Sequence, residues 1–216
     1  MVIIMVEIYL VRHSESEANL CRSFAGRTDV DISEKGKLQL ECLSKAFKNI
    51  KLDRVYTSSL KRAYKTAEAI NKYSETEVIV DDAFIEINLG VLDGKPVDDM
   101  TDEQKYNWNN QIHLFRVENG ETMYDVRKRV ETALNKVASE NDGKVIAIAS
   151  HGGVIRNLIA YIKGVPTDRL NTVNWCDNTG INHIYYDNGK FILDYENKSE
   201  HLSSEAKAIP VSSWSK

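Results

Sequence analysis

Apolar and polar residues alternate in blocks that predict strands and helices in turn. Short apolar runs bounded by polar turns are typical of buried strands, and the clearest are residues 8–11 and 145–149. Further strands are expected at residues 53–57, 77–80, 180–187 and 190–196, and helices at 34–47, 58–70, 122–141 and 153–162. This alternation predicts an α/β fold with three layers (α/β/α) and a mainly parallel sheet.

Local signals mark where several of these elements begin or turn. Ser33 and Thr122 belong to the residue types that cap helix N-termini, and each precedes an apolar stripe. Asn188 and Gly189 separate the last two expected strands and form a dipeptide favoured in two-residue hairpin turns. We therefore expect an antiparallel hairpin at one edge of the sheet.

Two segments have no clear pattern. Residues 91–120 are polar with irregularly spaced aromatic residues, so an inserted lid or shoulder is expected there. Five of its side chains are candidates either for contact with a second anionic or planar group or for ordinary surface and core: Lys105, Arg116, Tyr106, Trp108 and Phe115.

Residues 199–216 are rich in serine and are expected to form a loosely ordered tail after a single domain of residues 1–198.

Composition and charge limit the kinds of partner. The 216 residues are 42% hydrophobic and 28% charged, which suits a globular domain with a sizeable core. A net charge of −4 gives no general attraction to nucleic acid or to an anionic membrane. The opening residues lack the basic segment of a signal peptide, and no apolar run is long enough to span a bilayer. Three widely spaced cysteines indicate neither disulfides nor a zinc site, so a cytoplasmic location is expected.

Two of the expected strands end in a histidine. Arg12 and His13 follow the run at 8–11, and His151 follows the run at 145–149. A strand that ends in Arg-His is by itself more often a polar loop than an active site. In an open α/β sheet, however, the carboxyl ends of parallel strands border a single ligand crevice. Two strands that each bring a histidine to that edge therefore predict a site there.

Cations and a helix start accompany the two histidines. Arg62 lies in the first turn of the helix that follows the strand at 53–57, near another carboxyl end. Guanidinium donors match phosphate oxygens, and Gly152 and Gly153 open a helix whose free N–H groups attract anions. No acidic cluster balances these cations. The combination predicts a pocket for a phosphate group.

Histidines beside a phosphoryl group favour covalent catalysis. A neutral imidazole is nucleophilic near pH 7, so one histidine is expected to attack phosphorus while the other, with the arginines, neutralises charge in the transition state. The leaving alkoxide then needs a proton. The candidate carboxylates are Glu15 and Glu86, and partial burial behind Phe84 and Ile85 would favour a proton on Glu86. An equally good interpretation of Glu86 is a solvated loop carboxylate.

The chain carries five motifs in the order LVRHSESEAN (10–19), GRTD (26–29), TSSLKRA (57–63), EINLG (86–90) and SHGG (150–153). Together they resemble the successive motifs of the histidine phosphatase superfamily, in its phosphoglycerate mutase-like branch, over about residues 6–187. Each motif alone is unspecific, whereas the set in this order is specific. The resemblance implies a phosphohistidine mechanism, for which we expect neither a metal nor another cofactor.

The resemblance also implies roles for individual residues. The catalytic set comprises the nucleophile His13, the phosphate-binding arginines Arg12 and Arg62, the second pocket histidine His151 and the proton donor Glu86. The substrate-binding set comprises Asn19, Arg27, Thr28 and Gly152. The resemblance thus favours the interpretation of Glu86 as the proton donor over that of a solvated loop carboxylate.

One position departs from the family pattern. The residue after the nucleophile is usually glycine, and here it is Ser14. If glycine supplies a special backbone angle, Ser14 carries strain; if glycine supplies room, Ser14 narrows the pocket. We expect the serine to be tolerated.

The sequence therefore predicts a phosphatase of a small phosphorylated metabolite, with three weaker alternatives. A dinuclear metal phosphoesterase with ligands His13, Glu15 and His151 is disfavoured because the arginines would repel cations. A binding protein without activity is disfavoured because all the catalytic side chains are present. A phosphoglycerate mutase is disfavoured because residues 87–94 lack the arginine and tyrosine with which the family's mutases hold the substrate carboxylate. The expected partner is a small phosphate monoester, and no particular oligomeric state is predicted.

Overall fold

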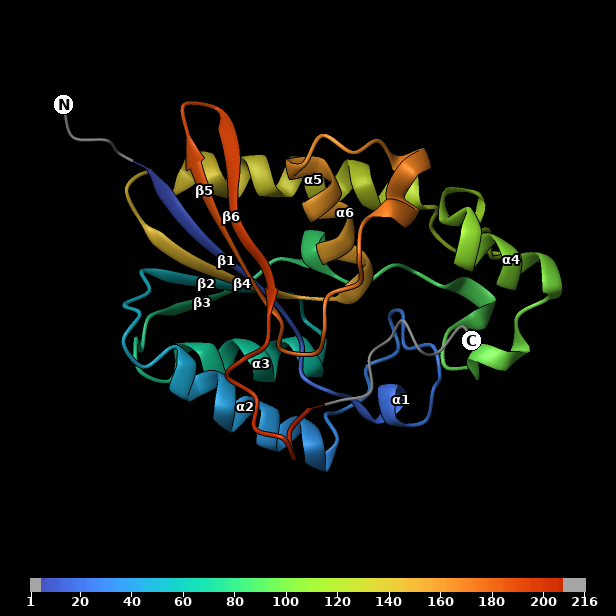
Figure 1. The fold of residues 1–216 in the computed structure, drawn as a ribbon, viewed down its shortest axis with the longest axis horizontal. Helices are drawn as coiled ribbons and strands as arrows, with labels where there is room; N and C mark the ends of the chain where they lie inside the picture. The colour runs from blue at the N-terminus through green and yellow to red at the C-terminus, as the bar shows by residue number, and fades with distance from the viewer. Residues whose placement is uncertain (1–4, 208–216) are drawn as a thin grey trace.

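A six-stranded sheet forms the middle layer of the computed structural model, which describes residues 5–207 (Figure 1). The strands are β1 (Val6–Arg12), β2 (Arg54–Thr57), β3 (Glu77–Val80), β4 (Val145–Ser150), β5 (Ile181–Asp187) and β6 (Lys190–Lys198). Their order across the sheet is β3-β2-β4-β1-β5-β6. The first four strands run parallel, and β5 pairs antiparallel with both β1 and β6. The predicted α/β fold with a mainly parallel sheet is confirmed.

Helices cover both faces of this sheet (Figure 1). On one face lie α2 (Glu34–Ala46) and α3 (Lys61–Asn71), and on the other α5 (Met123–Glu140) and α6 (Gly152–Ile162). The shorter helices are α1 (Glu17–Leu20) and α4 (Asp102–Asn110), and five 3-10 turns are η1 (Asp82–Phe84), η2 (Gly90–Leu92), η3 (Val97–Asp99), η4 (Ile112–Leu114) and η5 (Thr167–Thr172). None of the helices within the described residues is both long enough and apolar enough to cross a membrane.

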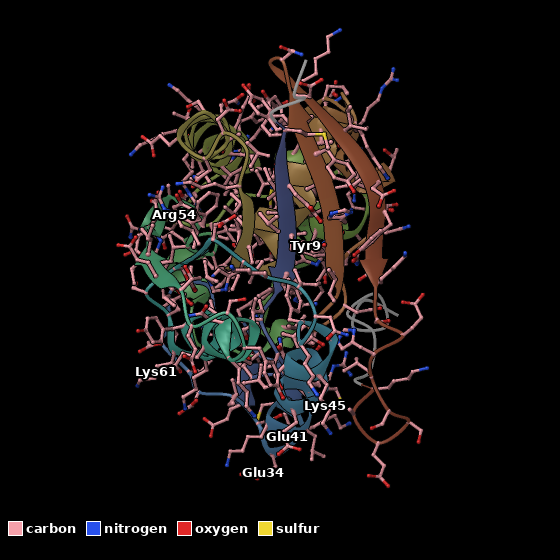
Figure 2. The ribbon with its side chains drawn as sticks, turned by 90° about the vertical axis from the view of Figure 1, so that its left-hand side faces the viewer. Tyr9, Glu34, Glu41, Lys45, Arg54 and Lys61 are labelled. Atoms are coloured by element: carbon pink, nitrogen blue, oxygen red, sulfur yellow. The ribbon has the colours of Figure 1, made fainter. Side chains whose placement is uncertain are left out.

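The central strands are apolar on both sides because each side packs against a helix layer. In β1, Ile8 and Leu10 belong to the core beneath α5 and α6, whereas Tyr9 and Val11 belong to the core beneath α2 and α3. The exposed charged residues of α2, three of which are labelled in Figure 2, lie away from the sheet. The near-continuous apolar run in the sequence thus reflects a strand that is buried on both faces.

The predicted caps and hairpin are present. The Ser33 side chain accepts a hydrogen bond from Gly36 N, and the Thr122 side chain accepts one from Asp125 N. Asn188 and Gly189 have φ angles of 47° and 80°, as a turn of the expected type requires, and join β5 to β6.

The helix expected from Ser58 begins three residues later, at Lys61. Ser59 N and Oγ instead donate to the carboxylate of Asp82, at 2.8 and 3.1 Å. Ser58 Oγ lies 2.7 Å from Nε2 of His151. The two serines therefore make tertiary contacts, and neither caps the helix.

The expected insertion at residues 91–120 contains α4 together with short 3-10 turns. Helix α4 begins with a capping box in which Thr101 and Gln104 exchange hydrogen bonds between side chain and backbone. None of its residues is fully buried, so it has no continuous apolar stripe by which the sequence would reveal a helix. The insertion is thus a folded shoulder of the domain.

The segment of residues 199–207 packs against the domain. Leu202 and Ala206 are buried, and the Gln39 side chain donates from Nε2 to the Ala206 carbonyl at 2.9 Å. This part of the chain differs from the loosely ordered tail that its serine content suggested, because two apolar residues anchor it. The remainder of that expected tail, residues 208–216, lies outside the described part.

Candidate active site

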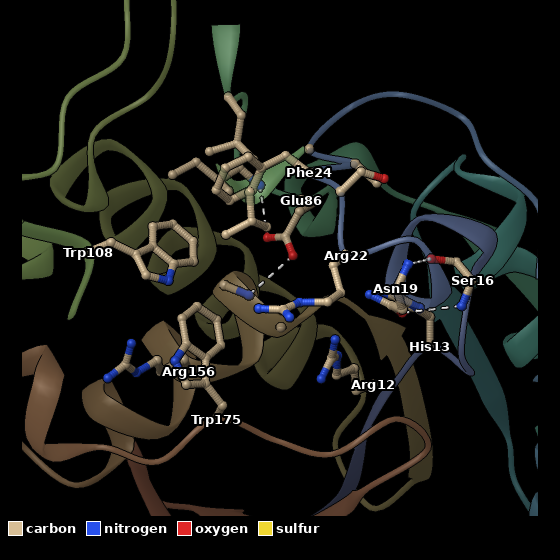
Figure 3. Close-up of a pocket in the computed structure, with 18 of the residues that line it drawn as sticks. Arg12, His13, Ser16, Asn19, Arg22, Phe24, Glu86, Trp108, Arg156 and Trp175 are labelled. Atoms are coloured by element: carbon tan, nitrogen blue, oxygen red, sulfur yellow. Dashed lines mark hydrogen bonds between the residues drawn. The ribbon is translucent and has the colours of Figure 1, made fainter. Parts of the chain in front are cut away.

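Parallel pairing of β1 and β4 places the two predicted histidines side by side. Arg12 lies opposite Ser150 in this pair, and the backbone N–H of His13 donates to the Ser150 carbonyl at 2.8 Å. The rings of His13 and His151 are 5.2 Å apart between centroids. His13 lines a cavity of about 770 Å³, a size typical of small-molecule sites (Figure 3).

His13 is held in one tautomer by its own backbone. Its Nδ1 atom lies 2.7 Å from the Ser14 carbonyl, which only accepts hydrogen bonds, so Nδ1 carries the proton and Nε2 has a free lone pair. Burial, with the charges of Arg62 and Arg12, lowers the pKa of His13 well below its ordinary value of 6.5. The ring is therefore neutral and nucleophilic at pH 7.

His151 is also buried and neutral. Burial and the charge of Arg62 lower its pKa well below 6.5. Its Nε2 lies 2.7 Å from Ser58 Oγ, and its buried Nδ1 has no hydrogen-bond partner within residues 5–207. When the serine hydroxyl donates to Nε2, Nδ1 carries the proton and is left to donate to an anion. A serine hydroxyl can donate or accept, so the contact is compatible with this tautomer but does not select it. His151 itself lies next to His13 and is not among the residues that line the cavity.

Both predicted arginines are fixed by backbone carbonyls. Arg12 donates from Nη1 to the Cys176 carbonyl at 2.6 Å, and its buried Nε has no partner among the described residues. Arg62 donates to three carbonyls of residues 25–28 at 2.8 to 3.0 Å. A carbonyl orients a guanidinium without cancelling its charge. Both arginines therefore retain their positive charge for a phosphate in the cavity that they line.

Glu86 is half-buried and also lines the cavity. One carboxylate oxygen accepts from Ile87 N at 2.9 Å, and the other accepts from Gly153 N at 3.2 Å (Figure 3). A Cβ atom at residue 153 would lie 2.7 Å from Glu86 Oε1, so this close approach requires glycine. The first turn of α6 therefore positions the carboxylate in the same cavity as the nucleophile.

An ion pair behind Glu86 holds the segment that carries this residue, and no sequence pattern predicted it. Arg129 donates to the backbone carbonyls of Ala83 and Glu86 and pairs with Glu121 at 2.9 Å. Glu121 also accepts from Asn88 N at 2.8 Å. Although burial opposes it, the hydrogen bond and charge of Arg129 lower the pKa of Glu121 and keep the pair ionised. Hydrogen bonds on both sides of Glu86 thus fix the position of the segment that carries it.

Two of the four residues that are expected to bind substrate line the cavity. Asn19 lines the cavity, and its Oδ1 accepts from Ser16 N and from Asn178 Nδ2, both at 3.2 Å. These bonds orient the amide so that its NH₂ group is left as the donor for a ligand. Gly152 lines the cavity as well, at the start of α6.

Arg27 and Thr28 differ from expectation, because neither side chain lines the cavity. The exposed Arg27 lies 3.3 Å from Glu121, and Thr28 Oγ1 donates to Asp93 at 3.1 Å. Their turn contributes through its backbone instead, since the Thr28 carbonyl holds Arg62. The resemblance gave their place in a motif but not the direction of their side chains.

Glu15 faces away from the cavity. It is buried and accepts a hydrogen bond from Ser33 Oγ at 2.7 Å, at the start of α2. Of the two candidate carboxylates, Glu86 therefore lies in the cavity and Glu15 supports the fold. Of the ligands of the proposed dinuclear metal site, His13 and His151 are adjacent but Glu15 binds Ser33 instead. Nowhere in residues 5–207 do three or more His, Cys, Asp or Glu side chains form a group suited to a metal ion.

Ser14 is accommodated without backbone strain, although its buried Oγ has no hydrogen-bond partner within the described residues. Its φ angle is not among the positive values of the described chain, so the backbone does not require glycine there. The residue is fully buried, its N–H donates to Thr66 Oγ1 at 3.1 Å, and its side chain does not line the cavity. Serine thus neither strains the backbone nor narrows the pocket.

The insertion supplies two of its five candidates to the cavity, Lys105 and Trp108. Phe115 is buried in the core, where its ring lies 4.9 Å from that of Trp108. Arg116 donates to nearby carbonyls of its own loop, and Tyr106 is exposed. The insertion therefore forms one wall of the cavity.

Sequence reasoning missed Arg156 and Trp175, which also line the cavity. Trp175 stacks on Trp108 with ring centroids 5.5 Å apart, and the Arg156 guanidinium lies 4.5 Å from the Trp175 centroid (Figure 3). Arg156 is five residues after His151 on α6, so a cation that follows the second histidine by about one and a half helical turns was the available signal.

Comparison with known proteins agrees with the family that the five sequence motifs indicated. Residues 8–199 match the family model of the histidine phosphatase superfamily (branch 1). The chain is 32% identical over 200 residues to putative phosphoserine phosphatase 2 of Hydrogenobacter thermophilus, covering 91% of this chain and 98% of that protein. It is 31% identical over 166 residues to the probable phosphoglycerate mutase GpmB of Escherichia coli, covering 75% and 77%.

Among solved structures, Bacillus stearothermophilus YhfR resembles the chain with a TM-score of 0.87 and 29% identity, covering 91% of this chain and 98% of that one. The chain therefore belongs to branch 1 of the histidine phosphatase superfamily, the phosphoglycerate mutase-like group of enzymes that its five motifs predicted.

Proposed function

We propose that this enzyme hydrolyses a small phosphate monoester through a phosphohistidine at His13. The observation that carries the proposal is the orientation of this ring. Because Nδ1 donates to the Ser14 carbonyl, the unprotonated Nε2 is the ring atom left for a ligand in the cavity. Arg12 and Arg62 line the same cavity and supply the charge that binds a phosphoryl group there.

The reaction proceeds in two balanced steps. In the first, Nε2 of His13 bonds to phosphorus, the ester P–O bond breaks, and Glu86 gives a proton to the leaving oxygen. The arginines neutralise charge on the non-bridging oxygens, and the Nδ1–H group of His151 donates a hydrogen bond to one of them. In the second step water attacks the phosphohistidine and gives its proton to Glu86, the P–N bond breaks, and inorganic phosphate leaves a neutral His13.

Hydrolysis is favoured over phosphoglycerate mutation by the segment that follows Glu86. Residues 87–94 contain no arginine or tyrosine. Leu89 and Leu92 are buried in the core, and Asn88 N binds Glu121. The segment therefore packs into the core and binds the Glu121 carboxylate that lies behind Glu86. A mutase remains the second candidate because of the similarity to GpmB, whereas the similarity to a putative phosphoserine phosphatase covers more of the chain.

The first test is to trap the intermediate. We expect phosphate from a labelled monoester to appear on His13 when the reaction is quenched in alkali, and His13→Ala to lower kcat by at least about three orders of magnitude. His113→Ala is the matched control, because His113 does not line the cavity. A label on His151, or full activity in His13→Ala, would contradict the assignment.

The second test separates Glu86 as acid from Glu86 as a structural group. We expect Glu86→Gln to lower kcat/KM for an alkyl phosphate by roughly 10²- to 10⁴-fold, and far less for p-nitrophenyl phosphate, whose leaving group departs without a proton. The control is Glu118→Gln, at an exposed position. An equal loss on both substrates would mean that Glu86 is not the proton donor.

The third test follows the protonation of His13. Because its pKa is lowered, the neutral nucleophile persists as the pH falls through 6.5, and the acid limb of kcat/KM should lie below that pH. Removing a nearby charge in Arg62→Met should raise the pKa of His13, whereas Arg62→Lys should largely preserve it. Titration of ¹⁵N-labelled histidine by NMR measures this directly, and a His13 pKa near 6.5 in the wild type would overturn the argument.

The fourth test distinguishes hydrolysis from mutation. The enzyme is incubated with 3-phosphoglycerate and a trace of 2,3-bisphosphoglycerate, and inorganic phosphate and 2-phosphoglycerate are measured together. We expect little isomerisation, and hydrolysis of at least one good monoester in a panel of sugar phosphates, phosphoglycerates and nucleotides. Isomer formation that exceeds phosphate release by orders of magnitude would identify a mutase.

A further inference from the structure

A buried arginine at one end of the cavity lacks an anionic partner. Arg156 is only 4% exposed, and its Nε donates to the Val173 carbonyl at 2.8 Å. Its Nη1 is buried and has no hydrogen-bond partner within the described residues. None of the ion pairs in this part of the chain includes Arg156. One buried positive charge therefore stays uncompensated beside a cavity.

A buried, unpaired charge lowers the stability of the fold unless a ligand of opposite charge binds to it. Burial lowers the pKa of Arg156 to about 10, so the guanidinium stays protonated at neutral pH. A buried charge without a partner destabilises a fold, and a donor left unsatisfied adds to that cost. The stack on Trp175 orients the guanidinium but brings no negative charge. An anionic ligand would supply the missing partner.

Arg156 lies on the far side of Trp175 from the phosphate-binding residues. A Cβ placed on Gly152 would be 3.4 Å from Arg12 Nε and 3.5 Å from the Trp175 ring, so this ring borders the phosphate end of the cavity. In Figure 3 Arg12 lies between His13 and Trp175, and Arg156 lies beyond Trp175. The alcohol part of a monoester bound at His13 would extend toward this end.

We propose that Arg156 binds a carboxylate on the alcohol part of the substrate and so selects phosphate monoesters that carry one. The inference rests on the proposed function, because it takes the transferred phosphate to lie at His13. The planar guanidinium fork fits a carboxylate, and the unpartnered Nη1 supplies a donor for it. Trp108 stacks on Trp175 and so supports the ring against which the Arg156 guanidinium lies.

The test compares substrates that differ only in the carboxylate. Phosphoserine and phosphoethanolamine form one pair, and 3-phosphoglycerate and glycerol phosphate of the same configuration form a second. We expect the wild type to prefer the carboxylate member of at least one pair. Arg156→Gln should lower kcat/KM for that member by about 10- to 100-fold and leave the other member within a few-fold.

A matched control variant is Arg127→Gln. Arg127 is a partly buried arginine that donates to the Asn157 and Val165 carbonyls and lies 5.4 Å from the Tyr161 ring centroid, but it does not line the cavity. We expect this variant to keep the wild-type ratio between the two substrates. Thermal unfolding of both variants measures any general loss of stability.

Two outcomes would overturn the proposal: a wild type that does not distinguish the members of either pair, or an Arg156→Gln variant that loses activity equally on both. The second is the result of a merely structural role. Calorimetric binding of the same pairs measures the preference whether or not turnover occurs. Failure of hydrolysis, which concerns His13, is thereby separated from failure of carboxylate recognition, which concerns Arg156.

Discussion

The in-register parallel pairing of β1 and β4 is the constraint on which the site depends. Because Arg12 lies opposite Ser150, the next residue of each strand is a histidine at the same level, and the two rings meet. Both rings are buried beside Arg12 and Arg62, where a further positive charge would be repelled. Burial, together with the charges that bind phosphate, thus keeps both imidazoles neutral, and a neutral His13 is the form that attacks phosphorus.

The way in which each arginine is held separates ligand-binding from structural roles. Arg12, Arg62 and Arg156 are anchored by backbone carbonyls, which fix the guanidinium and leave its charge available. Arg129 instead pairs with Glu121 and donates to carbonyls of the segment that carries Glu86. The charge of Arg129 is therefore compensated by a carboxylate of the protein itself. The chain therefore places neutral acceptors on the arginines that line the cavity and a carboxylate on the arginine that holds a loop behind it.

The sequence predicted what local chemistry determines and missed what tertiary contacts determine. The strand that ends at Arg12 and the cap at Ser33 depend on residues that are neighbours in the sequence, so periodicity and residue type were enough to place them. Arg27 was placed in the right motif but points to Glu121, because a motif does not state the direction of a side chain. Arg156 was missed because its significance comes from burial beside Trp175, a residue distant in the sequence.

The two ends of the cavity are built by different parts of the chain, and this separates chemistry from selectivity. The phosphate end is fixed by strand ends and by the first turn of α6, whose positions follow from the sheet. The other end depends on aromatic contacts between the insertion and the loop before β5, in which Trp108 stacks on Trp175 and meets the edge of Phe24. Since no residue of the insertion touches His13 in these contacts, changes at Trp108 or Lys105 can alter which alcohol fits without altering the nucleophile. Such a separation lets one scaffold keep its nucleophile while the wall that contacts the alcohol varies.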